Sequence, residues 1–276
     1  MINEFDVSII IVNYNSNDLL SNCIASIIKN VNCNYEVIIV DNNSSDNSFV
    51  DTKKKYKNLS NIIFHSSEVN LGFANANNLG FELSNGKLIH FLNPDTELLE
   101  SINNDYGNII NEYKSNTIYV NHIIDINGNY FKSKNLIPIL NNILKASIFN
   151  SKGKYWYTGA SIIIWKYFFI EIGKWPIDYF MYSEDMDLFF KCYKHFGVVS
   201  ELSNPIMHIG GGCSKNAWDS FQREIKVQNS LKIFYKKYNL IYQYYIFLVI
   251  IVLYKLFTRQ KDLQLYLRAI KKVNFN

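Results

Sequence analysis

Two runs rich in Val and Ile near the start of the sequence constrain the fold more than any other feature. Residues 7–12 and 35–40 have the composition of strands that are buried on both faces of a sheet. Between them, residues 18–29 place apolar side chains at helical spacing. A strand, a helix and a second strand in this order predict a parallel βαβ unit with a right-handed crossover. The sequence therefore predicts an α/β fold.

The same alternation continues along the chain. Residues 62–65 and 87–92 predict a third and a fourth strand, and residues 73–83 predict a helix between them. Apolar spacing further predicts helices at 102–113, 136–149 and 184–195, and strands at 117–126 and 198–208. We expect a Rossmann-like, mostly parallel central sheet flanked by helices, with a C-terminal helical extension.

A polar residue stands at the end of each of the first two predicted strands, Asn13 after the first and Asp41 after the second. Because the carboxyl ends of parallel strands share one edge of the sheet, we expect a ligand there. The Asp41 carboxylate can accept a hydrogen bond from N3–H of a uracil or thymine ring, with the Asn13 backbone supplying complementary groups. The alternative is that Asp41 and Asp46 are ordinary turn and N-cap residues. No Gly-x-Gly-x-x-Gly follows the first strand, which disfavours a dinucleotide-binding domain.

The fourth predicted strand ends in Asn93-Pro94-Asp95. Pro94 cannot donate to a sheet ladder, so the strand should stop there and present Asp95 just beyond its end. A carboxylate in this position is a candidate ligand for a hard divalent cation that carries a diphosphate, since Mg²⁺ usually takes only one or two protein carboxylates. The alternative is that Asp95 caps the following turn.

A second polar cluster, Glu184, Asp185 and Asp187, places three carboxylates within four residues beside aromatic side chains. Crowding of like charge raises carboxyl pKa values toward the range useful for a general base. The alternative is structural: Ser183 can N-cap the helix predicted at 184–195, and acids in its first turn complement the helix dipole.

Composition and charge narrow the class of protein. The 276 residues are 48% hydrophobic and 19% charged, which indicates a globular chain, and a dispersed net charge of +4 gives no reason to expect a nucleic-acid partner. The cysteines are far apart, which favours a reducing compartment. Acidic rather than basic residues open the chain, which argues against a signal peptide. We therefore expect a cytoplasmic protein.

The C-terminal part is dominated by an apolar run at 244–254 that ends at Lys255. The run is short for a membrane-spanning helix, and tyrosines and basic residues around it suit a lipid interface. We expect peripheral association with the inner face of the cytoplasmic membrane. A buried helix that forms a homodimer is the alternative.

Taken together, four motifs in a fixed order resemble one known family. They are residues 7–15, Val40-Asp41-Asn42-Asn43-Ser44, Asn70-Leu71-Gly72-Phe73 through Asn77-Asn78, and Phe91-Leu92-Asn93-Pro94-Asp95. In this order they are similar to the family 2 inverting glycosyltransferases of the GT-A fold, and within them to bacterial rhamnosyltransferases of polysaccharide assembly. The resemblance covers roughly residues 5–215, and it implies a glycosyltransferase domain at 1–215. The apolar and basic pattern after that domain leads us to expect a helical, membrane-associating segment at 216–276. The usual Asp-x-Asp of this fold stands here as Asn93-Pro94-Asp95, so a single carboxylate must serve.

The resemblance also implies roles for individual residues. It implies that Asp185 is the catalytic base, that Asp95 and His208 hold Mg²⁺ or Mn²⁺, and that Asn13, Asp41, Asn43, Gly72, Asn77 and Asp95 bind the donor. It also implies that Tyr182, Glu184 and Asp187 bind the acceptor, with orientation of the helix as the alternative role for Glu184 and Asp187. The small residues at Gly72, Ala74 and Ala76 would let the backbone approach a ligand, although helix packing explains them equally. The other histidines are expected to be structural.

The expected reaction is transfer of a sugar from a nucleotide-sugar donor to a hydroxyl of a lipid-linked or surface-polysaccharide glycan. L-Rhamnose from dTDP-rhamnose is the predicted donor. One alternative is another UDP- or dTDP-sugar, such as galactofuranose or a hexose. A second is a non-catalytic partner that only binds the sugar nucleotide within a glycan assembly complex.

Overall fold

A mixed sheet forms the centre of the computed structural model, which describes residues 5–147, 153–209, 219–258 and 262–273. Its strands are β1 (Val7–Asn13), β2 (Tyr35–Asp41), β3 (Ile62–Ser66), β4 (Leu88–Leu92), β5 (Thr96–Glu97), β6 (Thr117–Ile124), β9 (Ser161–Trp165) and β10 (Val198–His208). They lie in the order β3-β2-β1-β4-β9-β6-β10-β5. A separate antiparallel pair joins β7 (Lys134–Leu136) to β8 (Tyr155–Tyr157).

Parallel pairing dominates the sheet. β1 pairs in parallel with β2 and β4, β2 with β3, and β6 with β10, whereas β9 is antiparallel to both of its neighbours. Every residue of β1 and β4 is buried, as expected for strands covered on both faces. The predicted α/β architecture is confirmed, and the ends of β1, β2 and β4 meet at one edge.

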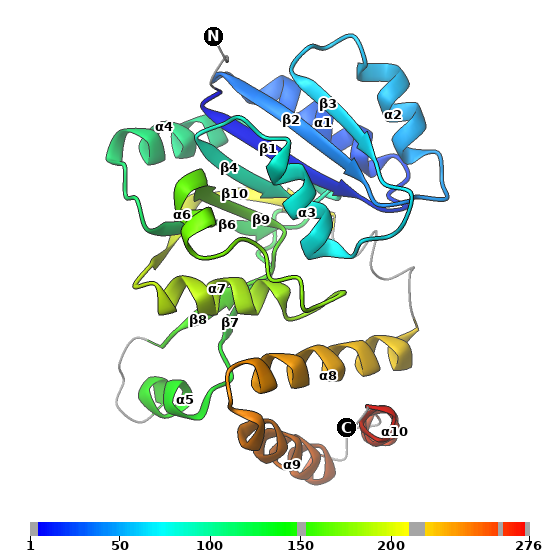
Figure 1. Cartoon of the computed structure of the whole chain (residues 1–276), viewed down its shortest axis with the longest axis vertical. Helices are drawn as coiled ribbons and strands as arrows, with labels where there is room; N and C mark the ends of the chain where they lie inside the picture. Colours follow the sequence, from blue (N-terminus) through cyan, green and yellow to red (C-terminus); the bar gives the residue numbers. More distant parts are fainter. Residues whose placement is uncertain (1–4, 148–152, 210–218, 259–261, 274–276) are drawn as a thin grey trace.

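The described helices lie partly against this sheet and partly beyond it, toward the bottom of the view in Figure 1. They are α1 (Leu19–Asn30), α2 (Ser48–Tyr56), α3 (Phe73–Glu82), α4 (Ile102–Glu112), α5 (Leu140–Ser147), α6 (Lys166–Glu171), α7 (Glu184–Lys194), α8 (Ser220–Lys237), α9 (Ile241–Phe257) and α10 (Leu263–Lys272). In Figure 1, α3 lies in front of the strands β1 and β2 and α1 lies behind them. Their covering of both faces explains the uninterrupted apolar runs in these strands.

Several segments differ from the prediction, among them β5, β8, β9 and α6, which were not predicted. The apolar stretch at 136–149 is not one helix, because β7 ends at Leu136 and α5 begins only at Leu140. Pro138 lies between them and removes a backbone donor. The helix α2 was not predicted, since its hydrophilic sequence buries only Phe49, Thr52 and Tyr56 beside the small Ser48.

A chain of buried hydrogen bonds crosses the sheet. His90 Nδ1 is bonded to the Tyr106 hydroxyl (2.7 Å), and Nε2 is bonded to the Ser161 hydroxyl (2.8 Å). Ser161 donates to Asn121 (2.8 Å), whose amide donates to Asp105 (3.1 Å). Burial lowers the pKa of His90 to about 3, so its imidazole is neutral at physiological pH. His90 thus has the structural role expected of it.

A second apolar cluster joins the C-terminal helices to the rest of the fold. Its buried members are Ile137, Tyr179, Met186, Phe234, Tyr235, Tyr244, Leu248 and Tyr266. Within the described parts of the chain, no helix is both long enough and apolar enough to cross a membrane. The predicted domain boundary between residues 215 and 216 lies outside the described residues.

Candidate active site

Asn13 and Asp41 end neighbouring strands and are partners in the β1–β2 register. The fully buried Asn13 amide lies 2.8 Å from Oδ1 of Asp41 and also donates to Ser44 and Ser48. Asp41 accepts two further bonds from Ser44, one from its hydroxyl (2.6 Å) and one from its amide (3.1 Å). Asn13 therefore positions Asp41, whose Oδ2 keeps a lone pair for a ligand. Asp46 accepts from the Ser48 amide at the start of α2 (3.1 Å), the capping role considered for it.

Asn42, the residue after β2, is hydrogen-bonded to the loop that contains Gly72. Its Oδ1 accepts from the Leu71 amide (2.7 Å), and its amide donates to Asn70 (3.0 Å). Gly72 follows with φ +79°, and a Cβ at this position would lie 2.5 Å from the carbonyl oxygen of Phe180. Glycine is required there because the chain needs both the left-handed conformation and the close approach. The predicted donor residue Gly72 thus touches the segment that leads to Asp185.

Two other predicted donor residues differ in their accessibility. Asn43 is exposed, with a left-handed φ of 63°, directly after the Asp41-Asn42 pair. Asn77 is only 2% exposed, and its amide donates to the carbonyl of Phe73 one turn earlier in α3 (3.0 Å). This bond back to the α3 backbone gives Asn77 a role inside the helix. Its predicted contact with the donor stays a prediction.

Asp95 and His208 come together where the short strand β5 pairs with the end of β10. Nε2 of His208 lies 3.1 Å from Oδ1 of Asp95, and the Asp95 side chain is 7% exposed. The turn after Pro94 is closed by Thr96, whose hydroxyl and amide both donate to the Asn93 carbonyl (2.7 and 3.2 Å). Thr96 thus fills the capping role considered for Asp95.

This pair fits a divalent cation. A carboxylate oxygen and an imidazole nitrogen are both ligands that Mn²⁺ accepts, and carboxylate suits Mg²⁺. No group of three or more His, Cys, Asp or Glu side chains with metal-site geometry occurs among the described residues. A cation bound by Asp95 and His208 would therefore take its remaining ligands from diphosphate oxygens and water.

The backbone before α7 is strained. Tyr182 and Ser183 have consecutive positive φ values of 71° and 66°, and each such residue costs roughly 1–3 kcal/mol. Ser183 is the N-cap residue of α7, as considered, but its side chain makes no cap bond among the described residues. Ser230 of α8 donates to the Met181 carbonyl (2.8 Å), and the guanidinium of Arg223 lies 5.9 Å from the centre of the Tyr182 ring. The predicted acceptor residue Tyr182 is thus held by α8.

Glu184, which is buried, and Asp185, which is half-buried, form a carboxyl pair at the start of α7. Burial raises the pKa of Asp185, although hydrogen bonds from the Met186 and Gly159 backbones oppose this. Burial, followed by the charge of Asp185, raises the pKa of Glu184. Among the described residues, Oε2 of Glu184 has no hydrogen-bond partner. The pair can therefore hold or release a proton nearer to neutral pH than ordinary carboxyls do.

Neighbouring residues lead from this pair to Asp95. The backbone of Gly159 is close enough to the Asp185 carboxylate to lower its pKa against the effect of burial. The next residue, Ala160, accepts a bond from the amide of Asn93 (3.0 Å), two residues before Asp95. Residues that are remote in the sequence therefore lie along one edge of the sheet, which is the juxtaposition expected for an active site.

Asp187 is different from its neighbours because it is completely buried and fully bonded. Its carboxylate accepts from Lys237 (2.8 Å) and Tyr179 (3.0 Å) and also from the hydroxyl of Tyr238. An acceptor hydroxyl cannot reach it, so the structure replaces the predicted acceptor contact with a role that holds α8 onto α7.

Sequence reasoning missed residues that position the site. Asn42 could have been noticed, since it stands inside the polar run after β2. Asn78 makes two bonds to the Trp175 backbone (3.0 and 3.1 Å), and Lys237 lies in α8. No local sequence pattern identifies either role, because their partners are distant in the chain.

Known proteins resemble this chain in sequence over part of its length. The sequence model described as "Glycosyl transferase family 2" matches residues 8–170. The chain is 30% identical over 114 residues to the minor teichoic acid biosynthesis protein GgaB of Bacillus subtilis (strain 168). The aligned stretch covers 41% of this chain and 13% of GgaB. It is 32% identical over 96 residues to the Escherichia coli UDP-Glc:alpha-D-GlcNAc-diphosphoundecaprenol beta-1,3-glucosyltransferase WfgD, which is 33% of this chain and 36% of WfgD. The matches therefore span only a minor part of these relatives.

Solved structures share the fold. S. aureus TarS 1–349 in complex with UDP-GlcNAc aligns with a TM-score of 0.59 at 19% identity, over 81% of this chain and 64% of that one. GalNAc-T7 with UDP, GalNAc and Mn²⁺ aligns with a TM-score of 0.62 at 16% identity, over 84% of this chain and 48% of that one. These neighbours have the GT-A fold. Since the family match covers more than half of its residues, the chain belongs to glycosyl transferase family 2.

Proposed function

We propose that this chain transfers a sugar from a nucleoside diphosphate donor to a glycan hydroxyl, with inversion of the anomeric configuration and with Asp185 as the base. The observation that carries the proposal is the bond from the Asn93 amide to the Ala160 carbonyl (3.0 Å), which joins the Asn93-Pro94-Asp95 turn to the Gly159-Ala160 backbone beside Asp185. It supports a base on one side of the sugar and a diphosphate site on the other.

In the proposed step, Asp185 takes the proton of the acceptor hydroxyl as its O–H bond breaks. The oxygen forms the new bond to the anomeric carbon, and the bond from that carbon to the diphosphate oxygen breaks. The nucleoside diphosphate leaves with the electron pair. The raised pKa of Asp185 suits this role, since a base works best when its pKa is near the operating pH.

Asp41 is proposed to accept from N3–H of the donor base, while Asn13 and Ser44 hold its carboxylate in place. Uracil and thymine both present this donor group. The names of WfgD and of the TarS complex, with UDP-Glc and UDP-GlcNAc, support a uridine donor, and dTDP-rhamnose remains the prediction from sequence. Asn43 and Gly72 are proposed to face the donor at the same edge.

Asp95 and His208 are proposed to hold Mg²⁺ or Mn²⁺ at the diphosphate, as their adjacent oxygen and nitrogen atoms support. When bound, such an ion neutralises charge that develops on the leaving diphosphate. The GalNAc-T7 structure contains Mn²⁺ together with UDP, which supports a divalent cation in this fold.

The acceptor is proposed to be a lipid-linked or surface-polysaccharide glycan, because GgaB is named for teichoic acid biosynthesis and WfgD for a diphosphoundecaprenol acceptor. Glu184, with an unbonded buried oxygen beside Asp185, is proposed to orient the acceptor hydroxyl, and Tyr182 to line its path. Residues 1–215 would carry this chemistry, residues 216–276 would associate with the cytoplasmic face of a membrane, and the chain would work in the cytoplasm.

The test is a panel of UDP- and dTDP-sugars, assayed for transfer and hydrolysis with and without Mg²⁺ or Mn²⁺. Asp185→Asn should abolish turnover and leave donor binding intact by calorimetry. Glu171→Gln, which changes an exposed carboxylate on α6, serves as the control and should retain activity. Turnover that persists in Asp185→Asn would refute the assigned base, and donor binding without turnover in the unaltered chain would favour the non-catalytic partner.

A further inference from the structure

The outer face of α9 carries an unbroken apolar stripe. Its members recur at spacings of three and four residues and include Tyr245, Ile246, Val249, Ile250, Leu253 and Phe257. Val249 is 59% exposed and Phe257 is 85% exposed. Side chains at this spacing lie on one side of a helix, so the exposed groups form one continuous surface along α9.

The opposite face of α9 already has its core partners. Tyr244 and Leu248 are buried against Tyr235 and Tyr266 in the second apolar cluster. The outward stripe is therefore not required for packing within the chain. Exposed apolar surface of this extent in a folded chain indicates a docking surface.

The charges around the stripe indicate what docks there. α9 contains no acidic residue, and the neighbouring α10 presents exposed Arg268, Lys271 and Lys272. Tyr242 and Tyr254 stand near the ends of the stripe, as aromatic residues do at a lipid interface. A second copy of the chain would bring these like charges together. An anionic bilayer would attract them.

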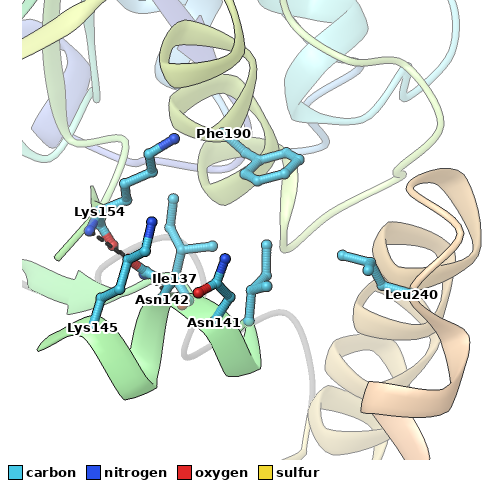
Figure 2. A pocket seen from close by; sticks show the side chains of 8 residues that line it. Ile137, Asn141, Asn142, Lys145, Lys154, Phe190 and Leu240 are labelled. Atoms are coloured by element: carbon cyan, nitrogen blue, oxygen red, sulfur yellow. Dashed lines mark hydrogen bonds between the residues drawn. The ribbon is translucent and has the colours of Figure 1, made fainter. Parts of the chain in front are cut away.

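A pocket of about 200 Å³ lies at the beginning of α9, and two lysines are among the residues that line it. Figure 2 shows Lys145 and Lys154 on one side of it and Leu240, the residue before α9, on the other. Ile137 and Phe190 supply apolar lining. An apolar floor beside two ammonium groups suits an anionic lipid headgroup.

We propose that α9 lies in the plane of an anionic bilayer, with this stripe facing the acyl chains and with the lysines of the pocket and the cations of α10 facing lipid phosphates. The proposal goes beyond the transfer chemistry and does not depend on it. Because α8 connects α9 to the Met181 carbonyl and to Asp187, a docked α9 would hold the proposed acceptor side at the membrane.

Co-sedimentation of the full chain with sucrose-loaded vesicles tests the proposal. The chain should bind phosphatidylcholine vesicles that contain one quarter phosphatidylglycerol, and the triple variant Ile246→Ser, Val249→Ser, Ile250→Ser should reduce partitioning by roughly tenfold or more. The control triple variant Ile126→Ser, Phe196→Ser, Val198→Ser changes exposed apolar residues elsewhere and should bind normally. Circular dichroism and urea unfolding verify that both variants fold.

Three results would overturn the proposal. One is equal vesicle binding by the stripe variant and the unaltered chain. Another is a dimer in light scattering that the stripe variant dissociates while neither protein binds vesicles, because a second copy would then be the occupant. The third concerns charge. The double variant Lys145→Gln, Lys154→Gln should weaken binding to anionic vesicles more than binding to pure phosphatidylcholine vesicles. If this variant prefers anionic vesicles as strongly as the unaltered chain does, the pocket is not part of the docking surface.

Discussion

Nε2 of His208 lies 3.1 Å from Oδ1 of Asp95, although the two residues are remote from each other in the sequence. The antiparallel pairing of β5 with β10 brings them together. If this pair holds the catalytic cation, His208→Gln removes one of the two protein ligands of that cation. The Mn²⁺ concentration that gives half-maximal transfer should then rise by about tenfold or more. His195→Gln, which changes an exposed histidine, should leave the Mn²⁺ titration unchanged. Identical titrations for both variants would exclude His208 as a ligand.

The raised pKa values at the start of α7 predict how activity depends on pH. A base must be deprotonated, so transfer should decline as pH falls through the raised pKa of Asp185, at a higher pH than the value of about 4 for an ordinary aspartate. The acidic limb of kcat/KM against pH measures this. A limb near pH 4 would show that Asp185 is not the titrating base.

Glu184 should lower the stability of the fold at high pH. Its folded-state pKa is raised, so it costs no stability below its unfolded pKa, and the cost grows as pH rises from there through the folded pKa. Glu184→Gln should therefore stabilise the chain by about 1–2 kcal/mol at pH 8.5 and by less at pH 5, as measured by urea unfolding. An equal effect at both pH values would contradict the raised pKa of the buried Glu184 carboxyl group.

Gly72→Ala should lower both stability and activity. The added Cβ would meet the Phe180 carbonyl and would need a positive φ, so a loss of roughly 1–3 kcal/mol is expected. Gly107→Ala in α4 is the matched control, because its Cβ would meet nothing within 4 Å and Ala favours a helix by about 1 kcal/mol. If the two variants have the same unfolding temperature, the contact between Gly72 and Phe180 does not limit which residue position 72 can hold.

Ser161→Ala tests the hydrogen-bond chain across the sheet. The substitution would leave His90 Nε2 and the Asn121 carbonyl oxygen without this partner, at a cost of about 1–3 kcal/mol. The exposed Ser60 gives the control Ser60→Ala, for which urea unfolding should show a change near zero. A neutral Ser161→Ala would indicate that water replaces the hydroxyl.

The sequence was informative where local patterns decide the structure. The runs that became β1, β2 and β4 are apolar throughout because both faces are covered, and Pro94 marks where β4 stops. Residue types alone were less informative where the outcome depends on distant partners. Asp187 and Asn77 look like ligands in sequence, yet Lys237 of α8 and the α3 backbone occupy their side chains. The hydrophilic α2 was missed because three well-spaced side chains suffice to pack it.

The ion pair between Lys237 and Asp187 has a consequence for how this protein can be divided. A shortened chain that stopped before α8 would leave the buried Asp187 carboxylate without its cation, two residues after the proposed base Asp185. Losing one member of such a pair costs about 3–5 kcal/mol, a large part of the margin by which a typical domain stays folded. The helix α8 is therefore part of what keeps α7 folded, and it cannot be removed without a loss of stability at the proposed active site.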